Sequence, residues 1–203
     1  KLESYVENGG TFVTSFYSGI VDENLLVKLG GYPGELRKLL GIWVEETDAL
    51  KPEQSNAIVM KQPYGALEGT YKCHFICDVM HAEGAEVVAE YGEDFYKGTP
   101  VVTRNSFGKG EAWYIATQPE PDFLAKWAAE LCRQKRIEPL PVAPEHVEVT
   151  QRVKDGNVFT FYLNHGDEAA SLSFSKAKRN IISGESVSGE VELKPKDVLI
   201  VQE

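Results

Sequence analysis

Cysteine and histidine side chains gather in one short stretch of the chain. Four of them fall within nine residues: Cys73, His74, Cys77 and His81. Thiolates and imidazoles are ligand types that zinc prefers, but a structural zinc site draws its ligands from separate turns or elements. This apolar stretch instead predicts one buried strand, with both cysteines on one face and His74 on the other. We expect buried thiols that behave as small hydrophobic side chains, with a zinc site as the alternative.

The same cysteines are candidates for a catalytic nucleophile. The strand-to-helix elbow that exposes a nucleophilic side chain needs glycines two residues to either side of it. Bulky residues occupy those positions around Cys73 and Cys77. The possible partners His81 and Glu83 lie too close in sequence to be positioned independently. We therefore expect no thiol catalysis.

Paired carboxylates are a third possible chemistry, because two carboxyl groups about 5 to 5.5 Å apart hydrolyse glycosides with retention. Glu45 and Glu46 are adjacent and diverge on either a helix or a strand. Glu83 and Glu86 flank the start of a predicted strand. We expect neither pair to act as a catalytic dyad.

The glycine-rich segment 29–34, Leu-Gly-Gly-Tyr-Pro-Gly, is the remaining motif. Its proline and apolar neighbours favour a shaped loop over a phosphate cradle. We interpret it as a turn in a long connection, or alternatively as a subunit contact with Tyr32 and Trp43 as aromatic anchors. Arg104 and Asn105 are candidates for the same contact or for a neighbouring active site. The sequence thus predicts no catalytic, metal-binding or cofactor-binding residue, and no cofactor.

The composition is that of a globular protein with a core, since 42% of the 203 residues are apolar and 26% are charged. The length is below the about 250 residues of a complete (β/α)₈ barrel. Acidic residues outnumber basic ones by 31 to 21, and the net charge of −10 disfavours nucleic acid and membrane surfaces as partners. We expect no signal peptide, no membrane span and no disulfide framework from three cysteines, and hence a cytoplasmic location.

Hydrophobic periodicity predicts a mixed region followed by an all-strand region. A helix that ends at Gly9 and Gly10 leads into a strand, which is half of a parallel unit without its preceding strand. Further expected elements are a helix at 35–40, strands at 57–60, 71–79, 86–91, 101–104 and 111–116, and a helix at 121–132. Beyond the prolines at 139, 141 and 144, strands are expected at 146–153, 157–165, 169–174 and 198–202. We predict an α/β domain over residues 1–143 and a small antiparallel domain over residues 144–203.

A series of segments, in order along the chain, resembles the non-catalytic part of β-galactosidases of glycoside hydrolase family 42. They are Tyr5–Thr14, Gly19–Asn24, Leu29–Gly34, Leu40–Glu46, Glu83–Val87, Asp94–Tyr96, Pro100–Asn105, Phe107–Gly110 and Tyr114–Thr117. Val158–His165 resembles, more loosely, the start of that family's C-terminal β-domain.

The resemblance implies a subunit of three parts: a barrel with two catalytic glutamates, an amidotransferase-like (Rossmann-like) three-layer α/β domain for trimerisation, and a small antiparallel all-β sandwich. This chain would be a fragment with the second part, lacking its first strand, and the third. The parent homotrimer would hydrolyse terminal non-reducing β-D-galactosides with retention and bind them in the missing barrel. The alternative is a stand-alone carbohydrate-binding or amidotransferase-like module. Trp43, Trp113 and Trp127 lie in segments expected to be buried, which disfavours stacking on sugars.

Overall fold

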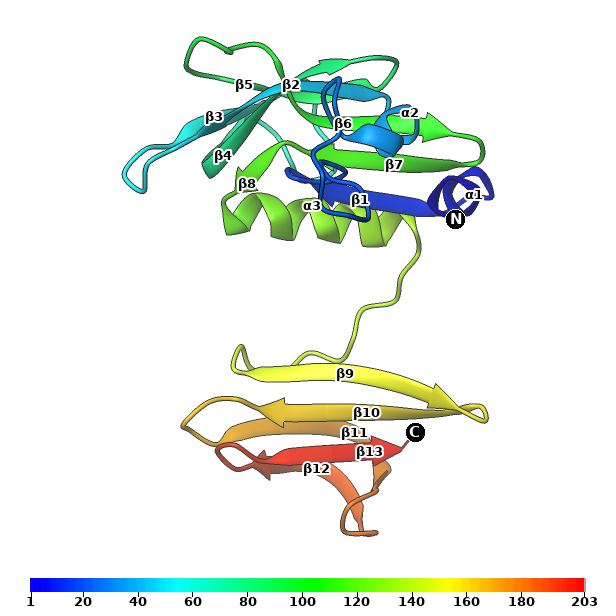
Figure 1. Cartoon of the computed structure of the whole chain (residues 1–203). Coiled ribbons are helices and arrows are strands. Elements are labelled where there is room, and N and C mark those ends of the chain that lie inside the picture. The colour runs from blue at the N-terminus through cyan, green and yellow to red at the C-terminus, as the bar shows by residue number, and fades with distance from the viewer. Residues whose placement is uncertain (203) are drawn as a thin grey trace. The chain divides into compact units, whose positions relative to one another are not determined.

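The computed structural model describes residues 1–202. It forms two compact units, which separate between Arg136 and Ile137 (Figure 1). Each unit encloses its own core of buried side chains. The segment with the three prolines begins the second unit, whereas the predicted boundary at 143/144 falls inside that segment and stays a prediction.

The first unit is built on an eight-stranded sheet. Its strands are β1 (Thr11–Ser15), β2 (Ile42–Ala49), β3 (Asn56–Met60), β4 (Thr70–Ala82), β5 (Glu86–Tyr91), β6 (Pro100–Phe107), β7 (Gly110–Ile115) and β8 (Thr117–Pro119). Its helices are α1 (Leu2–Glu7), α2 (Arg37–Leu40) and α3 (Pro121–Gln134), with a 3-10 turn η1 (Gly34–Leu36). The strand order is β1-β7-β6-β5-β3-β4-β2, with β8 paired to β4. Within the described residues β1 and β7 are parallel and the other pairs are antiparallel, so the predicted parallel arrangement holds only at this edge.

The amphipathic helix predicted before the prolines is confirmed as α3. Pro121 occupies its first turn, where a missing N–H breaks no helical hydrogen bond. Figure 1 shows α3 along one face of the sheet. Phe123 and Trp127 are buried there against Tyr71 and Trp113, with ring centroids 5.3 and 5.7 Å apart. None of the helices in residues 1–202 has the length and apolar character needed to cross a membrane.

Strand β2 is not among the predicted strands. A bulge between Val44 and Glu46 shifts its register against β4. A bulge moves the following side chains to the opposite face, so the period-two signal is lost. The bulged strand also carries Trp43, which is partly exposed, so the expectation of burial is wrong for this tryptophan and right for Trp113 and Trp127.

The second unit is an antiparallel five-stranded sheet in the order β12-β11-β13-β10-β9. Its strands are β9 (Val147–Lys154), β10 (Asn157–Asn164), β11 (Ala170–Asn180), β12 (Ser186–Leu193) and β13 (Val198–Gln202). A bulge between Phe174 and Lys178 interrupts β11, which pairs with β12 and, at its end, also with β13. Phe174 and Tyr162 of β10 pack in the core with ring centroids 5.6 Å apart, consistent with the predicted small sandwich. The sequence did not predict β12, in which Gly189 interrupts an exposed, polar strand.

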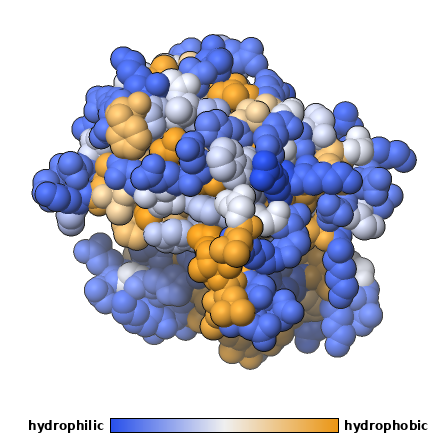
Figure 2. All heavy atoms as spheres, turned by 45° about the horizontal axis from the view of Figure 1, so that its top comes forward, coloured by the Kyte–Doolittle hydropathy of each residue, from blue (hydrophilic) through white to orange (hydrophobic). Residues whose placement is uncertain are grey.

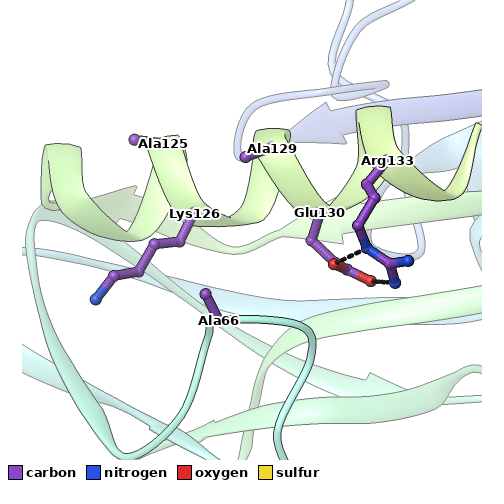
Figure 3. A pocket seen from close by; sticks show the side chains of 6 residues that line it. All are labelled: Ala66, Ala125, Lys126, Ala129, Glu130 and Arg133. Carbon is purple, nitrogen blue, oxygen red and sulfur yellow. Dashed lines mark hydrogen bonds and ion pairs between the residues drawn. The ribbon is translucent and has the colours of Figure 1, made fainter. Parts of the chain in front are cut away.

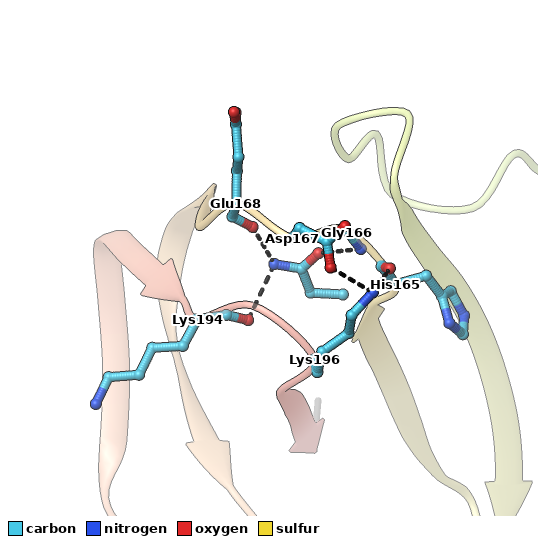
Figure 4. A network of polar contacts seen from close by, with 7 residues as sticks. His165, Gly166, Asp167, Glu168, Lys194 and Lys196 are labelled. Atoms are coloured by element: carbon cyan, nitrogen blue, oxygen red, sulfur yellow. Dashed lines mark hydrogen bonds and ion pairs between the residues drawn. The ribbon is translucent and has the colours of Figure 1, made fainter.

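Buried Asn164 lies at the end of β10, and its side chain binds the loops of the second unit that carry Glu168 and Lys194, which Figure 4 labels. Its side-chain nitrogen donates to the backbone oxygens of Glu168, Leu193 and Lys194 at 2.8, 3.2 and 2.9 Å. Its Oδ1 accepts a hydrogen bond of 2.9 Å from the backbone N–H of Gly166. An amide side chain can donate and accept at once, so it satisfies backbone groups of both kinds at this buried position.

Candidate assembly surface

Residues 16–33, which connect β1 to η1, form a surface segment that we call the strap. Its exposed apolar side chains are Tyr17, Val21, Leu25, Leu26, Val27 and Leu29. Leu25 is 80% exposed and Leu29 is 98% exposed. Figure 2 shows hydrophobic residues interrupting a mostly hydrophilic molecular surface. Exposed apolar groups that lie together are typical of protein contact sites, because burial in a partner removes them from water.

Strand β4 adds an aromatic side chain to the strap. Phe75 has a left-handed backbone, with φ of +70°, and is 55% exposed. Its ring lies 6.0 Å from that of Phe16, which in turn lies 5.7 Å from that of Tyr17. Phe75 therefore extends the apolar surface of the strap onto the sheet. Its positive φ carries no signal in the sequence, because non-glycine residues adopt it only under tertiary constraint.

Hydrogen bonds within the strap hold its backbone. Val21 and Val27 form an isolated antiparallel bridge. The N–H of Lys28 donates to the oxygen of Ile20 at 2.8 Å. The carboxylate of Asp22 accepts two backbone N–H groups of the same turn, at 2.8 and 3.0 Å. The apolar side chains are thus presented on a hydrogen-bonded turn.

The end of the strap is anchored to the sheet through a buried carboxylate. Asp78 of β4 is fully buried and accepts hydrogen bonds from the hydroxyls of Tyr32 at 2.6 Å, Thr47 at 2.8 Å and Tyr114 at 2.6 Å. Burial raises the pKa of Asp78, and the three hydroxyls oppose that rise. Burial likewise raises the pKa of the Tyr32 and Tyr114 phenols. Tyr32, proposed as a subunit-contact anchor, directs its hydroxyl into this chain's own interior. Asp78 was not singled out from the sequence. Its one signal in the sequence is that it is an acidic residue within an apolar predicted strand.

Trp43 lies at the surface beside the strap. Its indole Nε1 donates to the backbone oxygen of Gly30 at 3.2 Å. Its ring stacks on His81, with centroids 5.0 Å apart. His81 Nε2 lies 2.7 Å from a carboxylate oxygen of Glu45, while neighbouring Glu46 is exposed. Both aromatic anchors considered from the sequence are partly exposed, but only Tyr32 is hydrogen-bonded to the buried Asp78.

The remaining carboxylates from the sequence analysis pair with separate cations. Glu83 accepts two hydrogen bonds from Arg37, at 2.6 and 2.5 Å, and this guanidinium lowers the pKa of Glu83. Glu86 accepts from Arg104 at 2.6 Å. Asn105 donates at 2.8 Å to a backbone oxygen near the end of α2. Arg104 and Asn105 thus have partners within the chain.

The structure separates the cysteine and histidine candidates. Cys73 and Cys77 are fully buried, as predicted, and His74 is exposed, with its Nδ1 3.3 Å from a backbone oxygen. His81 lies at the surface, where its ring stacks on that of Trp43. Among residues 1–202, no three His, Cys, Asp or Glu side chains are grouped so as to hold a metal ion. The outward bulge at Phe75 between the two cysteines is the feature that strand periodicity missed.

A shallow hollow lies between α3 and the loop that precedes β4 (Figure 3). It has a volume of about 380 Å³ and is lined by Ala66, Ala125, Lys126, Ala129, Glu130 and Arg133. Glu130 and Arg133 form a two-bonded ion pair at 2.7 and 2.8 Å. Hydrogen bonds from Arg133 and then Gln134 lower the pKa of Glu130 to about 2. The acidic group of this hollow is therefore already paired within α3.

Two family models match the chain. The model of the β-galactosidase trimerisation domain matches residues 1–138, and that of the β-galactosidase C-terminal domain matches residues 146–203. The β-galactosidase BgaP of Planococcus sp. (strain L4) is 51% identical over 202 residues, which is 99% of this chain and 30% of that protein. The β-galactosidase Pbg of Clostridium perfringens is 40% identical over 207 residues, with 100% and 30% covered. The chain thus spans about 30% of the length of these curated relatives.

Solved structures give the same match. The β-galactosidase from Bacillus circulans sp. alkalophilus superposes with a TM-score of 0.89 at 49% identity. The β-galactosidase from Rahnella sp. R3 superposes with a TM-score of 0.84 at 32% identity. Each match covers 100% of this chain and 30% of the solved chain.

Proposed function

Because the chain belongs to the β-galactosidase trimerisation-domain family of glycoside hydrolase family 42, we propose that it is the assembly and C-terminal portion of a β-galactosidase. The parent enzyme hydrolyses terminal non-reducing β-D-galactosides with retention and binds them in a barrel outside this chain. Three copies associate through the first unit. The observation that carries this proposal is the exposed apolar strap on a domain of this family.

The strap supplies the driving force for association. Burying one leucine side chain is worth about 1.5 to 3 kcal/mol. Leu25, Leu26 and Leu29 are all exposed in the single chain. Their burial opposes the loss of translational and rotational freedom that association imposes. The hydrogen-bonded turn lowers the additional entropy lost on binding, since its backbone is already fixed.

Light scattering after gel filtration, at tens of micromolar chain, tests the assembly. We expect a trimer for the chain itself and a monomer for the double variant Leu25→Asp/Leu29→Asp. The control is Val142→Asp, because Val142 is 99% exposed but lies outside the strap, and this variant should stay trimeric. A monomer without any substitution, or a trimer that survives both strap substitutions, would contradict the proposal.

Catalysis provides a second test. We expect the purified chain not to cleave a chromogenic β-galactoside, and turnover that persists after repurification would contradict the assignment. A stand-alone carbohydrate-binding module, the alternative from the sequence, predicts that galactose or lactose raises the Tm. Our proposal predicts no shift of Tm and no change in tryptophan fluorescence.

The proposal has three further parts: an amidotransferase-like fold of the first unit, a cytoplasmic location and a domain boundary at 143/144. The first is supported by the helix, glycine and parallel strand at the chain start. The second is supported by three unpaired thiols, and cell fractionation tests it. A glutamate-specific protease tests the third, because the exposed Glu145 lies next to the boundary and should be cut first, leaving two protected pieces, whereas Pro139 blocks cleavage after Glu138.

A further inference from the structure

The thiols of Cys73 and Cys77 lie against each other inside the first unit. In an uninterrupted strand, residues four apart are separated by about 13 Å. Here β4 bulges outward at Phe75, and its register with β8 passes from Cys73 opposite Pro119 to Cys77 opposite Thr117. The two cysteines therefore lie opposite two residues of β8 that are only two positions apart, and both cysteines face the core.

The resulting geometry suits a covalent bond between the two sulfur atoms. Positions two residues apart along a strand are separated by about 6.6 Å, within the Cα separation of about 4.4 to 6.8 Å found for disulfides. Each thiol shifts the pKa of the other, raising that of Cys73 and lowering that of Cys77, as expected for neighbouring groups. Both are fully buried and unpaired. Closing a disulfide thus requires adjustment of two side chains and no refolding of the strand.

Polar groups around Cys77 favour its thiolate. Its hydrogen bond with Cys73, and then the hydroxyls of Tyr96, Thr117 and Tyr91, lower the pKa of Cys77 to about 7 in spite of burial. The Sγ of Cys77 lies 3.8 Å from the Oγ1 of Thr117. The hydrogen bond with Cys77 and burial raise the pKa of Cys73. The hydroxyl of Thr117 beside its Sγ is the contact that makes Cys77 the member of the pair disposed to attack.

A surface hollow approaches the pair. It has a volume of about 480 Å³, and its lining residues include Thr14, Phe16, Thr117 and Trp127. Thr117 both lines this hollow and contacts the Sγ of Cys77. A molecule about the size of water that enters the hollow is therefore separated from the sulfur by the Thr117 side chain.

We propose that Cys73 and Cys77 are a peroxide-sensitive dithiol site that closes to an intrachain disulfide. The thiolate of Cys77 attacks one oxygen of hydrogen peroxide, the O–O bond breaks, and sulfenic acid and hydroxide form. The sulfur of Cys73 then attacks the sulfenic sulfur, forms the S–S bond and expels a second hydroxide, while its thiol proton is released. With both hydroxides protonated, two thiols and one peroxide give one disulfide and two waters. A thiol reductant reverses the oxidation.

The test uses the intact 203-residue chain, whose third cysteine is an internal control. The chain is treated with hydrogen peroxide, its remaining thiols are alkylated under denaturing conditions, and it is digested with trypsin. Cys73 and Cys77 fall on the tryptic peptide 73–97 and Cys132 on the peptide 127–133. We expect peptide 73–97 to lose two hydrogens, to escape alkylation and to regain both thiols with dithiothreitol. Its thiols should disappear at least tenfold faster than that of Cys132.

The unsubstituted chain alone decides the proposal. The proposal is overturned if the thiols of Cys73 and Cys77 disappear no faster than the thiol of Cys132. It is also overturned if peptide 73–97 gains oxygen without forming a disulfide. Single variants then assign the roles. Cys73→Ser should stop at a sulfenic acid on Cys77 that dimedone labels, whereas Cys77→Ser should leave Cys73 a thiol, and the reverse result would overturn the assignment of roles. Cys132→Ser should form the disulfide at the unchanged rate.

Discussion

The phenol of Tyr32 donates a hydrogen bond of 2.6 Å to the carboxylate of Asp78, which lies on the interior strand β4 and has no exposed surface. A buried carboxylate needs donors in place of water, and an unsatisfied one is strongly unfavourable. Tyr114 and Thr47 supply two of those donors from the sheet itself. The third comes from the strap, so the position of the strap is coupled to the solvation of a charge in the core.

The substitution Tyr32→Phe should destabilise the first unit. It removes one donor from Asp78 while keeping the ring, and loss of a hydrogen bond to a buried charged group costs about 1 to 3 kcal/mol. Urea denaturation followed by tryptophan fluorescence measures the effect. Tyr5→Phe is the matched control, because Tyr5 is 56% exposed, and it should leave the midpoint unchanged. Equal stability of Tyr32→Phe and the unsubstituted chain would show that the strap does not solvate Asp78.

Alanine substitutions at two adjacent glycines of the strap should distinguish the cost of backbone strain from the cost of steric overlap. Gly30 and Gly31 both have positive φ, +96° and +85°. A Cβ on Gly31 would overlap the indole Nε1 of Trp43, whereas a Cβ on Gly30 would meet no atom within 4 Å. Gly30→Ala should therefore cost only the strain of about 1 to 2 kcal/mol for a left-handed residue. Gly31→Ala should cost more and should also shift the fluorescence of Trp43. Equal losses and unchanged spectra in the two variants would contradict this account of the contact.

The ion pair of Glu130 should make stability fall in acid. The pKa of Glu130 is lowered from 4.5 to about 2 in the folded chain. Between these values the unfolded chain binds more protons, so the pair stabilises the fold above pH 4.5 and this contribution is lost as the pH falls toward 2. The difference in unfolding free energy between the unsubstituted chain and Glu130→Gln should thus shrink from pH 7 to pH 3. Denaturant titrations at several pH values measure it, with the exposed Glu138→Gln as control. A difference that is constant with pH would contradict the prediction.

In the second unit, Asn164→Asp should be more harmful than Asn164→Ala. The alanine variant leaves buried backbone groups without their partner, at about 1 to 3 kcal/mol. The aspartate keeps the shape of the side chain but turns a carboxylate oxygen toward the backbone oxygens of Glu168, Leu193 and Lys194. Far-ultraviolet circular dichroism should follow unfolding, since the chain's tryptophans lie in the first unit. Equal stability of the aspartate variant and the unsubstituted chain would refute this role of the amide.

Local patterns predicted those elements whose residues follow one period throughout. Helix α3 has an uninterrupted amphipathic spacing, and its termini lie close to those expected from the sequence. Strand β2 and the middle of β4 were harder because bulges near Val44 and Phe75 shift the side-chain alternation. Bulges depend on pairing with distant strands, so a single segment of sequence carries little trace of them.

In the candidate assembly surface, too, some features could be predicted from the local sequence and others depend on distant strands. The glycine-rich motif lies at the end of the strap, in the long connection expected from the sequence, and Trp43 contacts it through Gly30, while the role of Trp43 in a subunit contact stays a prediction. The inward direction of Tyr32 was not predictable, because it depends on Asp78, whose burial is decided by the sheet. The contact between Cys73 and Cys77 likewise needs the bulge that removes Phe75 from between them.

The parallel pairing of β1 with β7 places Thr11 opposite Glu111, a hundred positions later in the chain. The neighbouring hairpin of β6 and β7 closes over only a few residues. Contacts between residues distant in sequence require closure of a long loop and tend to form late. We expect β1 to dock last in folding and its amides to exchange with deuterium before those of β6. The strap follows β1 directly, so a nascent subunit would display its leucines in native position only after the rest of the sheet is complete, which delays self-association until late in folding.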